Sequence, residues 1–234
     1  MKKQKIYLLP GLMTDERLWE RLKPYLEDSY ELIHIPLPKS YDFEEINLII
    51  EKYFKEEKVN LLGFSLGSYI ATYYAIKNPH RIKRVFNLAG SPSASHPIEI
   101  VRREIKLKEI EKKGFFSLPY EKAISLLEEK NQNDTQLVDT IVDMFTSLGE
   151  ENYVYQLKST FYRKDLHEEL KELEFPIYYY YSTKDRLLNH ASIKKLEELK
   201  HPHIKLFNRE GYSHNIPLEE PELLSKYIKM WLES

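Results

Sequence analysis

The feature that most constrains this chain is a serine between two glycines, in Gly63-Phe64-Ser65-Leu66-Gly67. An apolar run of strand length enters the motif from Val59, and a helix-like segment leaves it at once. The pattern therefore predicts a strand, a sharp turn that carries Ser65, and a helix. Side chains beside so tight a turn would clash with neighbouring backbone, and the glycines remove them. The alternative is an ordinary turn with an incidental serine.

Strand-like and helix-like segments alternate on both sides of this motif, which predicts a parallel sheet covered by helices on both faces. Strands are expected at residues 5–9, 30–35, 59–63, 82–89, 176–182 and 203–207. Helices are expected between them, including one from about Asp15 through Leu26 and a last one over 217–232.

The alternation breaks between Ser93 and Leu170. This stretch has no convincing strand, and charged helix-like segments occur near 97–113, 119–131, 134–148 and 150–161. We therefore expect an α/β core domain formed by residues 1–92 and 171–234, with a helical insertion over 93–170. A chain of 234 residues that is 42% hydrophobic suits one such domain.

Composition argues against several classes of function. The 35 basic and 37 acidic residues leave a net charge of −2, so nothing indicates a protein that binds nucleic acid or a membrane surface. The chain has no cysteine, which excludes disulfides and fits a reducing compartment. The apolar run that begins at Ile6 is interrupted by Pro10 and Gly11, unlike a secretory signal, and no stretch has the length of a membrane span. We expect a soluble, cytoplasmic protein.

A serine hydroxyl is a poor nucleophile, so chemistry at Ser65 needs a base and a third group that orients the base. In an open parallel sheet both must lie at the carboxyl ends of the strands. Of the eight histidines, His214 alone lies in a glycine-containing loop after the last expected strand. Asp185 follows the penultimate strand in the same way. The alternatives are a surface-loop histidine and a turn aspartate that pairs with a neighbouring lysine or arginine.

The order Ser65, Asp185, His214 resembles that of the α/β-hydrolase superfamily over nearly the whole chain. This resemblance implies a sheet of about six strands without the N-terminal hairpin, and a lid where the insertion falls. The segment Leu9-Pro10-Gly11-Leu12-Met13 resembles the family's oxyanion loop, with proline in place of the usual histidine. The resemblance implies an oxyanion hole formed by the backbone N–H groups of Leu12 and Leu66.

We therefore expect a carboxylic ester hydrolase, of esterase or thioesterase type, that forms an acyl-enzyme on Ser65. The expected pocket walls favour an apolar acyl group and include Phe64, Tyr212, Phe115 and Phe116. Two alternatives stay open: a C–C bond hydrolase or lyase with the same three residues, and a ligand-binding protein that has lost turnover. No H-E-x-x-H motif or P-loop occurs, so no metal or other cofactor is expected.

Within the helix expected near 97–113, residues 101–113 carry six basic residues against three acidic ones. In this respect the chain is similar to pimeloyl-acyl-carrier-protein methyl ester esterases, whose basic lid faces an acidic carrier protein. The resemblance implies an acyl carrier protein as a partner at the lid, with Arg102 and Arg103 in the contact. A solvated helix of mixed charge is the simpler interpretation.

Overall fold

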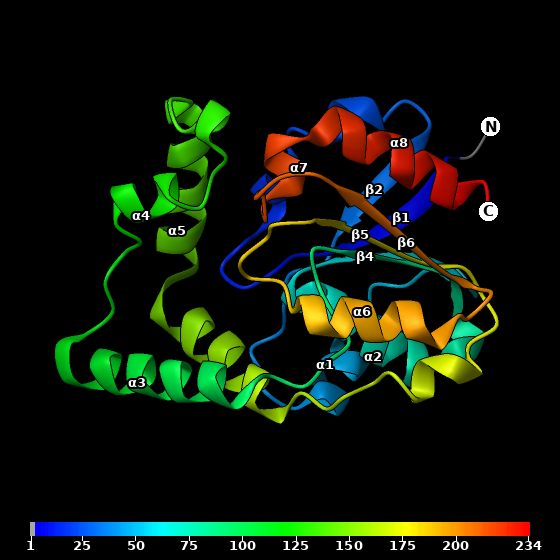
Figure 1. Cartoon of the computed structure of the whole chain (residues 1–234), viewed down its shortest axis with the longest axis horizontal. Helices are drawn as coiled ribbons and strands as arrows, with labels where there is room; N and C mark the ends of the chain where they lie inside the picture. The colour runs from blue at the N-terminus through cyan, green and yellow to red at the C-terminus, as the bar shows by residue number, and fades with distance from the viewer. Residues whose placement is uncertain (1–2) are drawn as a thin grey trace.

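The computed structural model describes residues 3–234, which form a six-stranded, all-parallel sheet with helices on both faces (Figure 1). In spatial order the strands are β2 (Tyr30–His34), β1 (Gln4–Leu9), β3 (Val59–Phe64), β4 (Ile82–Leu88), β5 (Ile177–Ser182) and β6 (Ile204–Arg209). The predicted fold class and number of strands are confirmed. Because the chain runs from β1 to the edge strand β2 and then returns to β3, the strand order reverses between β1 and β3. Ligands of open α/β sheets bind outside the carboxyl ends of the strands at such a point.

Helices cover both faces because both faces of every central strand are apolar. One face packs against α1 (Phe43–Glu51), α2 (Leu66–Lys77) and α6 (His190–Leu199). The other packs against η1 (Glu16–Trp19), α7 (Ile216–Glu219), α8 (Pro221–Leu232) and the side chains of Leu22 and Leu26 that flank η2 (Lys23–Tyr25) (Figure 1). Within β1, Tyr7 and Leu9 belong to the first core, and Ile6 and Leu8 to the second, as the strand period of two requires.

The helical segment between β4 and β5, here called the insertion (residues 93–170), lies beside the sheet, past the carboxyl ends of its strands (Figure 1). It contains α3 (Pro97–Lys113), α4 (Tyr120–Ile124), η4 (Glu129–Asn131), α5 (Thr135–Ser159) and η5 (Thr160–Tyr162); η6 (Glu169–Glu172) begins at its end. The two helices expected at 134–148 and 150–161 form one element, α5, interrupted at Gly149, whose φ of 70° and ψ of −175° are not helical. The expectation of one helix over 119–131 is wrong, since Glu128 is extended and separates α4 from η4.

Two further helices are shorter than expected, and a proline explains each difference. The helix expected from about Asp15 through Leu26 is replaced by η1 and η2, and Pro24 lies inside this stretch, where its ring and missing N–H oppose a continuous helix. The last helix is divided at Glu220, which precedes Pro221 and has a non-helical ψ of 48°. Within residues 3–234, no helix combines the length and the apolar character that crossing a membrane requires.

Candidate active site

Ser65 lies on the turn between β3 and α2, as predicted, and its backbone conformation is unusual. Its φ is 52° and its ψ −111°, a region that non-glycine residues rarely adopt. The Ser65 N–H donates to the Leu88 carbonyl at 2.8 Å, which ties the turn to the end of β4. Strain of this kind persists only where the surrounding structure enforces it, and it concentrates at functional sites.

The two glycines of the motif are required by close backbone approach. A Cβ atom on Gly63 would lie 2.2 Å from the Gly67 carbonyl oxygen, and one on Gly67 would lie 2.3 Å from that of Pro10. Both distances are far below van der Waals contact. The turn therefore tolerates no side chain at either position, and Gly67 lets it pack directly against the loop after β1.

The structure brings Asp185 and His214 to Ser65. Nε2 of His214 lies 3.0 Å from Oγ of Ser65, and Nδ1 of the same ring lies 2.7 Å from Oδ2 of Asp185. Asp185 follows β5 and His214 follows β6, so all three residues lie at the carboxyl edge of the sheet. His214 is only 9% exposed and Asp185 1% exposed, which keeps the chain of contacts largely free of competing water.

Both oxygens of the Asp185 carboxylate are engaged, which fixes its orientation. Oδ1 accepts the Leu187 N–H at 2.8 Å while Oδ2 faces the imidazole. The Phe64 ring packs against the imidazole, with ring centroids 5.1 Å apart. The ring of His214 is therefore held from two sides, with Nε2 directed at the serine.

The loop after β1 leaves one backbone donor free beside Ser65. The Gly11 N–H donates to Oγ1 of Thr14 at 2.8 Å, and the Met13 N–H donates to Oε1 of Gln156 at 2.7 Å. Between them, the Leu12 N–H has no acceptor among the described residues, and neither does the Leu66 N–H at the start of α2. Because buried backbone donors are normally paired, two free N–H groups at one site indicate room for a ligand oxygen.

Gln156 could not be found from the sequence. It lies on α5 of the insertion, is 4% exposed, and is separated from Met13 by 143 positions. Its amide oxygen holds Met13, whose φ of 55° is itself unusual. An isolated glutamine on an amphipathic helix carries no sequence signal for such a contact.

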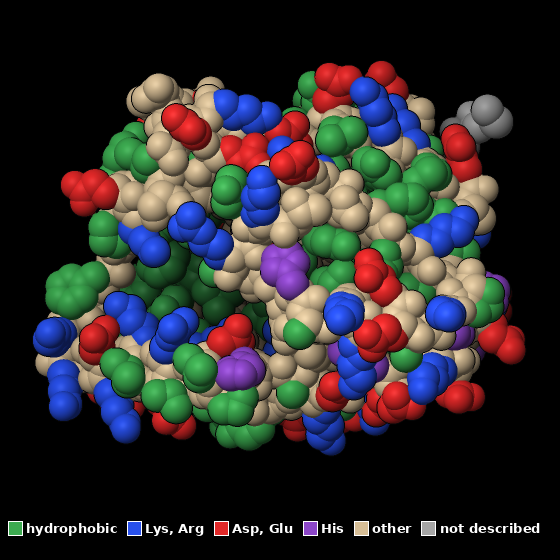
Figure 2. Space-filling view, in the orientation of Figure 1, with side chains coloured by type: hydrophobic (Ala, Val, Ile, Leu, Met, Phe, Trp, Pro, Cys, Tyr) green, Lys and Arg blue, Asp and Glu red, His purple; other side chains and the backbone are tan. Residues whose placement is uncertain are grey.

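A cavity of about 430 Å³ opens at Ser65 between the core and the insertion. It appears in Figure 2 as a hollow with an apolar interior and basic side chains around it. Phe64 lines it, as predicted, together with Leu12 and Leu66. The insertion contributes apolar side chains that were not foreseen: Leu118, Leu126, Ile141, Met144 and Phe145.

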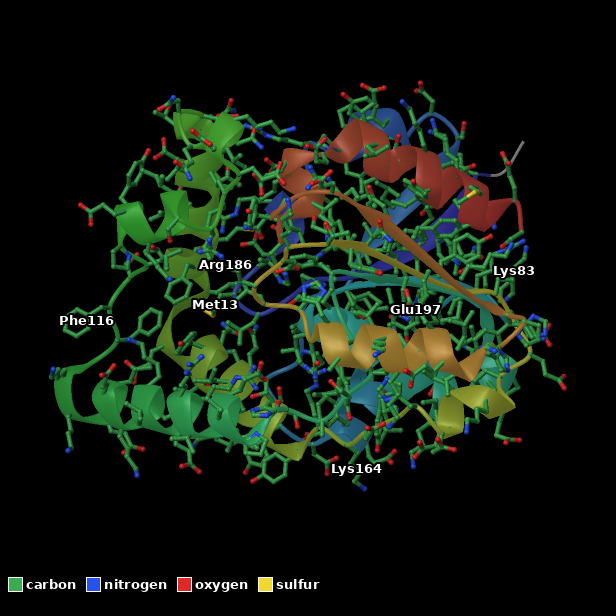
Figure 3. The ribbon with its side chains drawn as sticks, viewed as in Figure 1. Met13, Lys83, Phe116, Lys164, Arg186 and Glu197 are labelled. Carbon is green, nitrogen blue, oxygen red and sulfur yellow. The ribbon has the colours of Figure 1, made fainter. Side chains whose placement is uncertain are left out.

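Three residues predicted to line this pocket lie elsewhere. Phe115 stacks on Phe145, with ring centroids 5.4 Å apart, beside a separate cavity within the insertion. Phe116 is 67% exposed and points away from the core (Figure 3). Tyr212 is exposed, with Lys184 and Arg186 over its ring, and it lines a different cavity that also reaches Asp185 and His214. Aromatic character in the sequence did not reveal the direction of these side chains, and none of the three lines the cavity at Ser65.

Glu128 of the insertion supports the loop that carries His214. Its carboxylate accepts the Tyr212 N–H at 2.9 Å and the Ser213 N–H at 3.2 Å, and it pairs with Arg209 at 2.7 Å. The Glu128 and Arg209 side chains are each 11% exposed. Burial alone would raise the pKa of Glu128, but the hydrogen bonds from Arg209, Ser213 and Tyr212 outweigh burial and lower the pKa.

Replacing Glu128 with glutamine will destabilise the protein by about 2 kcal/mol at neutral pH, since it removes charged hydrogen bonds from Arg209, which keeps only the carboxylate of Glu220 at 3.2 Å. A lowered folded-state pKa stabilises the fold above the unfolded value of about 4.3, and this stabilisation is lost as pH falls through the folded pKa. Urea unfolding at neutral pH and near the folded pKa should therefore show the difference between wild type and variant shrinking in acid. Glu129→Gln, at an exposed neighbour, is the control. A pH-independent difference would contradict this account.

A second group of serine, histidine and aspartate lies away from the cavity. Nδ1 of His167 lies 2.6 Å from Oδ1 of Asp165, and Nε2 lies 3.0 Å from Oγ of Ser192. The His167 ring and Ser192 are fully packed between the end of the insertion and α6, and neither lines the cavity at Ser65. The position of this second group, away from the cavity, indicates that it stabilises the fold. The described part of the chain has no group of acidic, histidine or cysteine residues that could hold a metal ion.

Comparison with known proteins agrees with this architecture. A sequence model of the family described as "alpha/beta hydrolase fold" matches residues 6–221. The chain is 23% identical to the uncharacterized hydrolase YugF of Bacillus subtilis (strain 168), over 97% of this chain and 89% of that protein. It is 31% identical to a pimeloyl-[acyl-carrier protein] methyl ester esterase of Legionella pneumophila (strain Corby), over only 37% of this chain and 38% of that protein. The enol-lactonase from Burkholderia xenovorans LB400 shares the fold, with a TM-score of 0.84, 18% identity, and coverage of 100% of this chain and 93% of that one.

Proposed function

This chain belongs to the alpha/beta hydrolase fold family, and from that premise we propose that it is a serine hydrolase cleaving carboxylic esters or thioesters through an acyl-enzyme on Ser65. The observation that carries the proposal is the contact series Ser65, His214, Asp185, with distances of 3.0 and 2.7 Å, at the edge of an apolar cavity. Hydrogen-bond contact between nucleophile and base, and between base and orienting group, is the signature of an activated nucleophile.

In the proposed reaction, the Ser65 hydroxyl attacks the acyl carbonyl while Nε2 of His214 takes its proton. Asp185 holds the imidazole in the tautomer whose Nδ1–H faces the carboxylate, and it stabilises the imidazolium that forms. His214 then gives the proton to the departing alcohol or thiol, and the acyl group stays on Ser65. Water attacks this ester in turn, with His214 again as the base, and releases the acid.

The free N–H groups of Leu12 and Leu66 are the proposed oxyanion hole. Charge develops on the substrate oxygen in the transition state, and donors already fixed in place stabilise it without reorganisation. Pro10 removes no needed donor, because the N–H in question belongs to Leu12. The insertion (residues 93–170) is the proposed lid over a core formed by residues 1–92 and 171–234, since its side chains close the cavity.

The proposal is tested by a serine-directed fluorophosphonate together with a panel of p-nitrophenyl esters and acyl thioesters. We expect the probe to label Ser65 and the panel to be hydrolysed. A lyase or C–C hydrolase should turn over these esters poorly, and a binding protein should hold ligands without a burst of product. Lack of labelling, combined with esterase activity that survives Ser65→Ala, would reject the mechanism.

Replacing Gln156 with methionine will lower kcat by up to about 100-fold and change KM little, because a misplaced oxyanion donor acts in the transition state. Methionine keeps the volume but cannot accept the Met13 N–H, so the loop that presents Leu12 loses its anchor. Steady-state kinetics on one p-nitrophenyl ester measures the effect. Asn152→Met, one turn earlier on α5 and half-buried, is the control. Equal losses in the two variants would show that Gln156 has no special role.

The similarity to a pimeloyl-[acyl-carrier protein] methyl ester esterase covers little of either chain. It supports the proposed ester chemistry, and docking of a carrier protein on α3 stays a prediction. Binding that weakens with salt, and is lost when Arg102 and Arg103 are both changed to glutamate, would support that partner.

A further inference from the structure

The cavity at Ser65 is lined by apolar side chains and also by several basic ones. Four arginines line it, against a single glutamate, Glu99: Arg102, Arg103, Arg163 and Arg186. Figure 2 shows basic side chains gathered around the hollow, and Figure 3 places Arg186 on the core side of it. An apolar acyl chain alone gives no reason for this concentration of positive charge, since each partly buried cation costs desolvation energy.

Arg163 is the arginine of this cavity that combines burial with the lack of a carboxylate partner. Its Nη2 donates to the Ser91 carbonyl at 2.8 Å, and its guanidinium lies over the Tyr69 ring, 4.3 Å from the centroid. Its Nε is buried without a hydrogen-bond partner, and no carboxylate of the described residues pairs with it. Burial lowers the pKa of Arg163 to about 10, so the side chain remains charged at neutral pH. A desolvated cation without a counter-ion is unfavourable unless a ligand supplies the charge.

Arg163 is also held in a fixed position in the cavity that Ser65 lines. Tyr69 lies one helical turn after Ser65 on α2, and its hydroxyl accepts the Lys164 N–H at 2.7 Å and donates to the Lys164 carbonyl at 3.1 Å. Ser91 follows β4, the strand to which the Ser65 turn is tied. The two contacts of Arg163 thus fix its guanidinium relative to Ser65. Such preorganisation is what a binding group for a planar anion needs.

The other three arginines of the cavity differ in exposure and in whether a carboxylate already pairs with them. Arg103 is paired with Glu99 at 3.3 Å and donates to Oγ of Ser95 at 2.7 Å. Arg102 and Arg186 are exposed at the cavity and have no carboxylate partner in the described part of the chain. They therefore attract an anion to the cavity, and Arg163 is the group placed to bind it inside.

We propose that Arg163 binds a carboxylate at the far end of the acyl group, so that the preferred substrate is a monoester of a dicarboxylic acid. This inference rests on the proposed function and names its substrate class. The apolar walls contact the methylene chain, Ser65 attacks the ester carbonyl, and the distal carboxylate supplies the counter-ion that Arg163 lacks. Bidentate N–H donation from a guanidinium suits a carboxylate geometrically.

The test compares two esters of equal chain length, mono-p-nitrophenyl adipate, which carries a free carboxylate, and p-nitrophenyl hexanoate, which does not. Wild type should prefer the anionic ester in kcat/KM, and Arg163→Met should reduce that preference about 10- to 100-fold, the range for hydrogen bonds to a charged group. The loss should fall mainly on KM for the anionic ester. Arg163→Lys should restore part of the preference. Lys83→Met, which removes one charge at the opposite end of the molecule (Figure 3), should leave it unchanged.

The failures of the two proposals are distinguishable. If wild type hydrolyses both esters without preference, or if Arg163→Met keeps the wild-type ratio, the carboxylate site is wrong while the serine mechanism stands. If no ester is hydrolysed and Ser65 resists the fluorophosphonate, the mechanism is wrong. Calorimetric titration of adipate then tests the carboxylate site independently of hydrolysis. Binding to wild type that is lost in Arg163→Met would support the site, and absence of binding to wild type would overturn it.

Discussion

Ser65→Ala will lower kcat for a p-nitrophenyl ester by about 10⁶-fold, the scale on which removal of a catalytic serine acts. The proposed mechanism routes every turnover through a covalent bond to Oγ, and alanine offers no atom that His214 could activate. The residual rate should come from the free N–H groups of Leu12 and Leu66 and from binding, and should lose the burst of product.

The measurement must distinguish loss of chemistry from loss of fold. Ser225→Ala removes a buried serine of α8 that bonds only within its own helix and lies outside the cavity, and it should keep wild-type kinetics. Thermal melting should be similar for both variants. Alanine at position 65 should keep the strained φ of the serine, because the close approach of Gly63 and Gly67 imposes the geometry of the turn. The substitution should therefore not stabilise the protein by releasing strain. Activity above one-tenth of wild type in Ser65→Ala would reject the acyl-enzyme.

The residues that sequence reasoning brought together share one property. Ser65, Asp185 and His214 each lie in the turn or loop that follows a recognisable strand, and the carboxyl ends of parallel strands meet at one edge of a sheet. Sheet topology therefore makes neighbours of three positions that are distant in the sequence. The loop around Leu12 was predicted from its resemblance to the family's oxyanion loop, and it too follows a strand, β1.

The residues that sequence reasoning missed lie in the insertion. Gln156, Glu128 and Arg163 reach the site through helix packing, and the strand-end rule gives no information there. The pocket aromatics were misplaced for the same reason: the direction of Phe115 depends on how Phe145 packs across the insertion. The break at Gly149 agrees with the two helices expected on either side of it. Pro24 and Pro221 interrupt helices that were expected to be continuous, although the backbone constraint of proline is readable in the sequence.

The group Ser192, His167 and Asp165 has the same residue types as Ser65, His214 and Asp185, so comparing the two shows which features an active site needs besides contact distances. The distances are nearly the same: 3.0 Å from serine to histidine in both, and 2.7 against 2.6 Å from histidine to carboxylate. The surroundings differ. Ser65 opens into a cavity with two free N–H groups nearby, whereas Ser192 is buried at the start of α6, where no substrate can reach it. Contact distances alone therefore do not define an active site.

Asp185→Asn will lower kcat by about 10⁴-fold, because an amide can present the wrong partner to Nδ1 and cannot stabilise an imidazolium. Asp165→Asn, the matched change in the second group, should leave kcat within about twofold of wild type, since a substitution outside the site removes no transition-state contact. Its effect should fall on stability instead. Burial alone would raise the pKa of Asp165, but hydrogen bonds from Lys195 and His167 lower it to about 2. That stabilisation is present above the unfolded pKa of about 3.9 and is lost as pH falls toward 2.

Kinetics and urea unfolding on the two variants give opposite profiles if this assignment is right. Asp185→Asn should be inactive, and the fluorophosphonate should label its Ser65 far more slowly, because labelling also needs an activated hydroxyl. Asp165→Asn should be labelled at the wild-type rate, and its stability difference from wild type should shrink in acid. Loss of activity in Asp165→Asn at a temperature where it is folded would place His167 in the chemistry. It would also overturn the conclusion that only the group that opens into the cavity is catalytic.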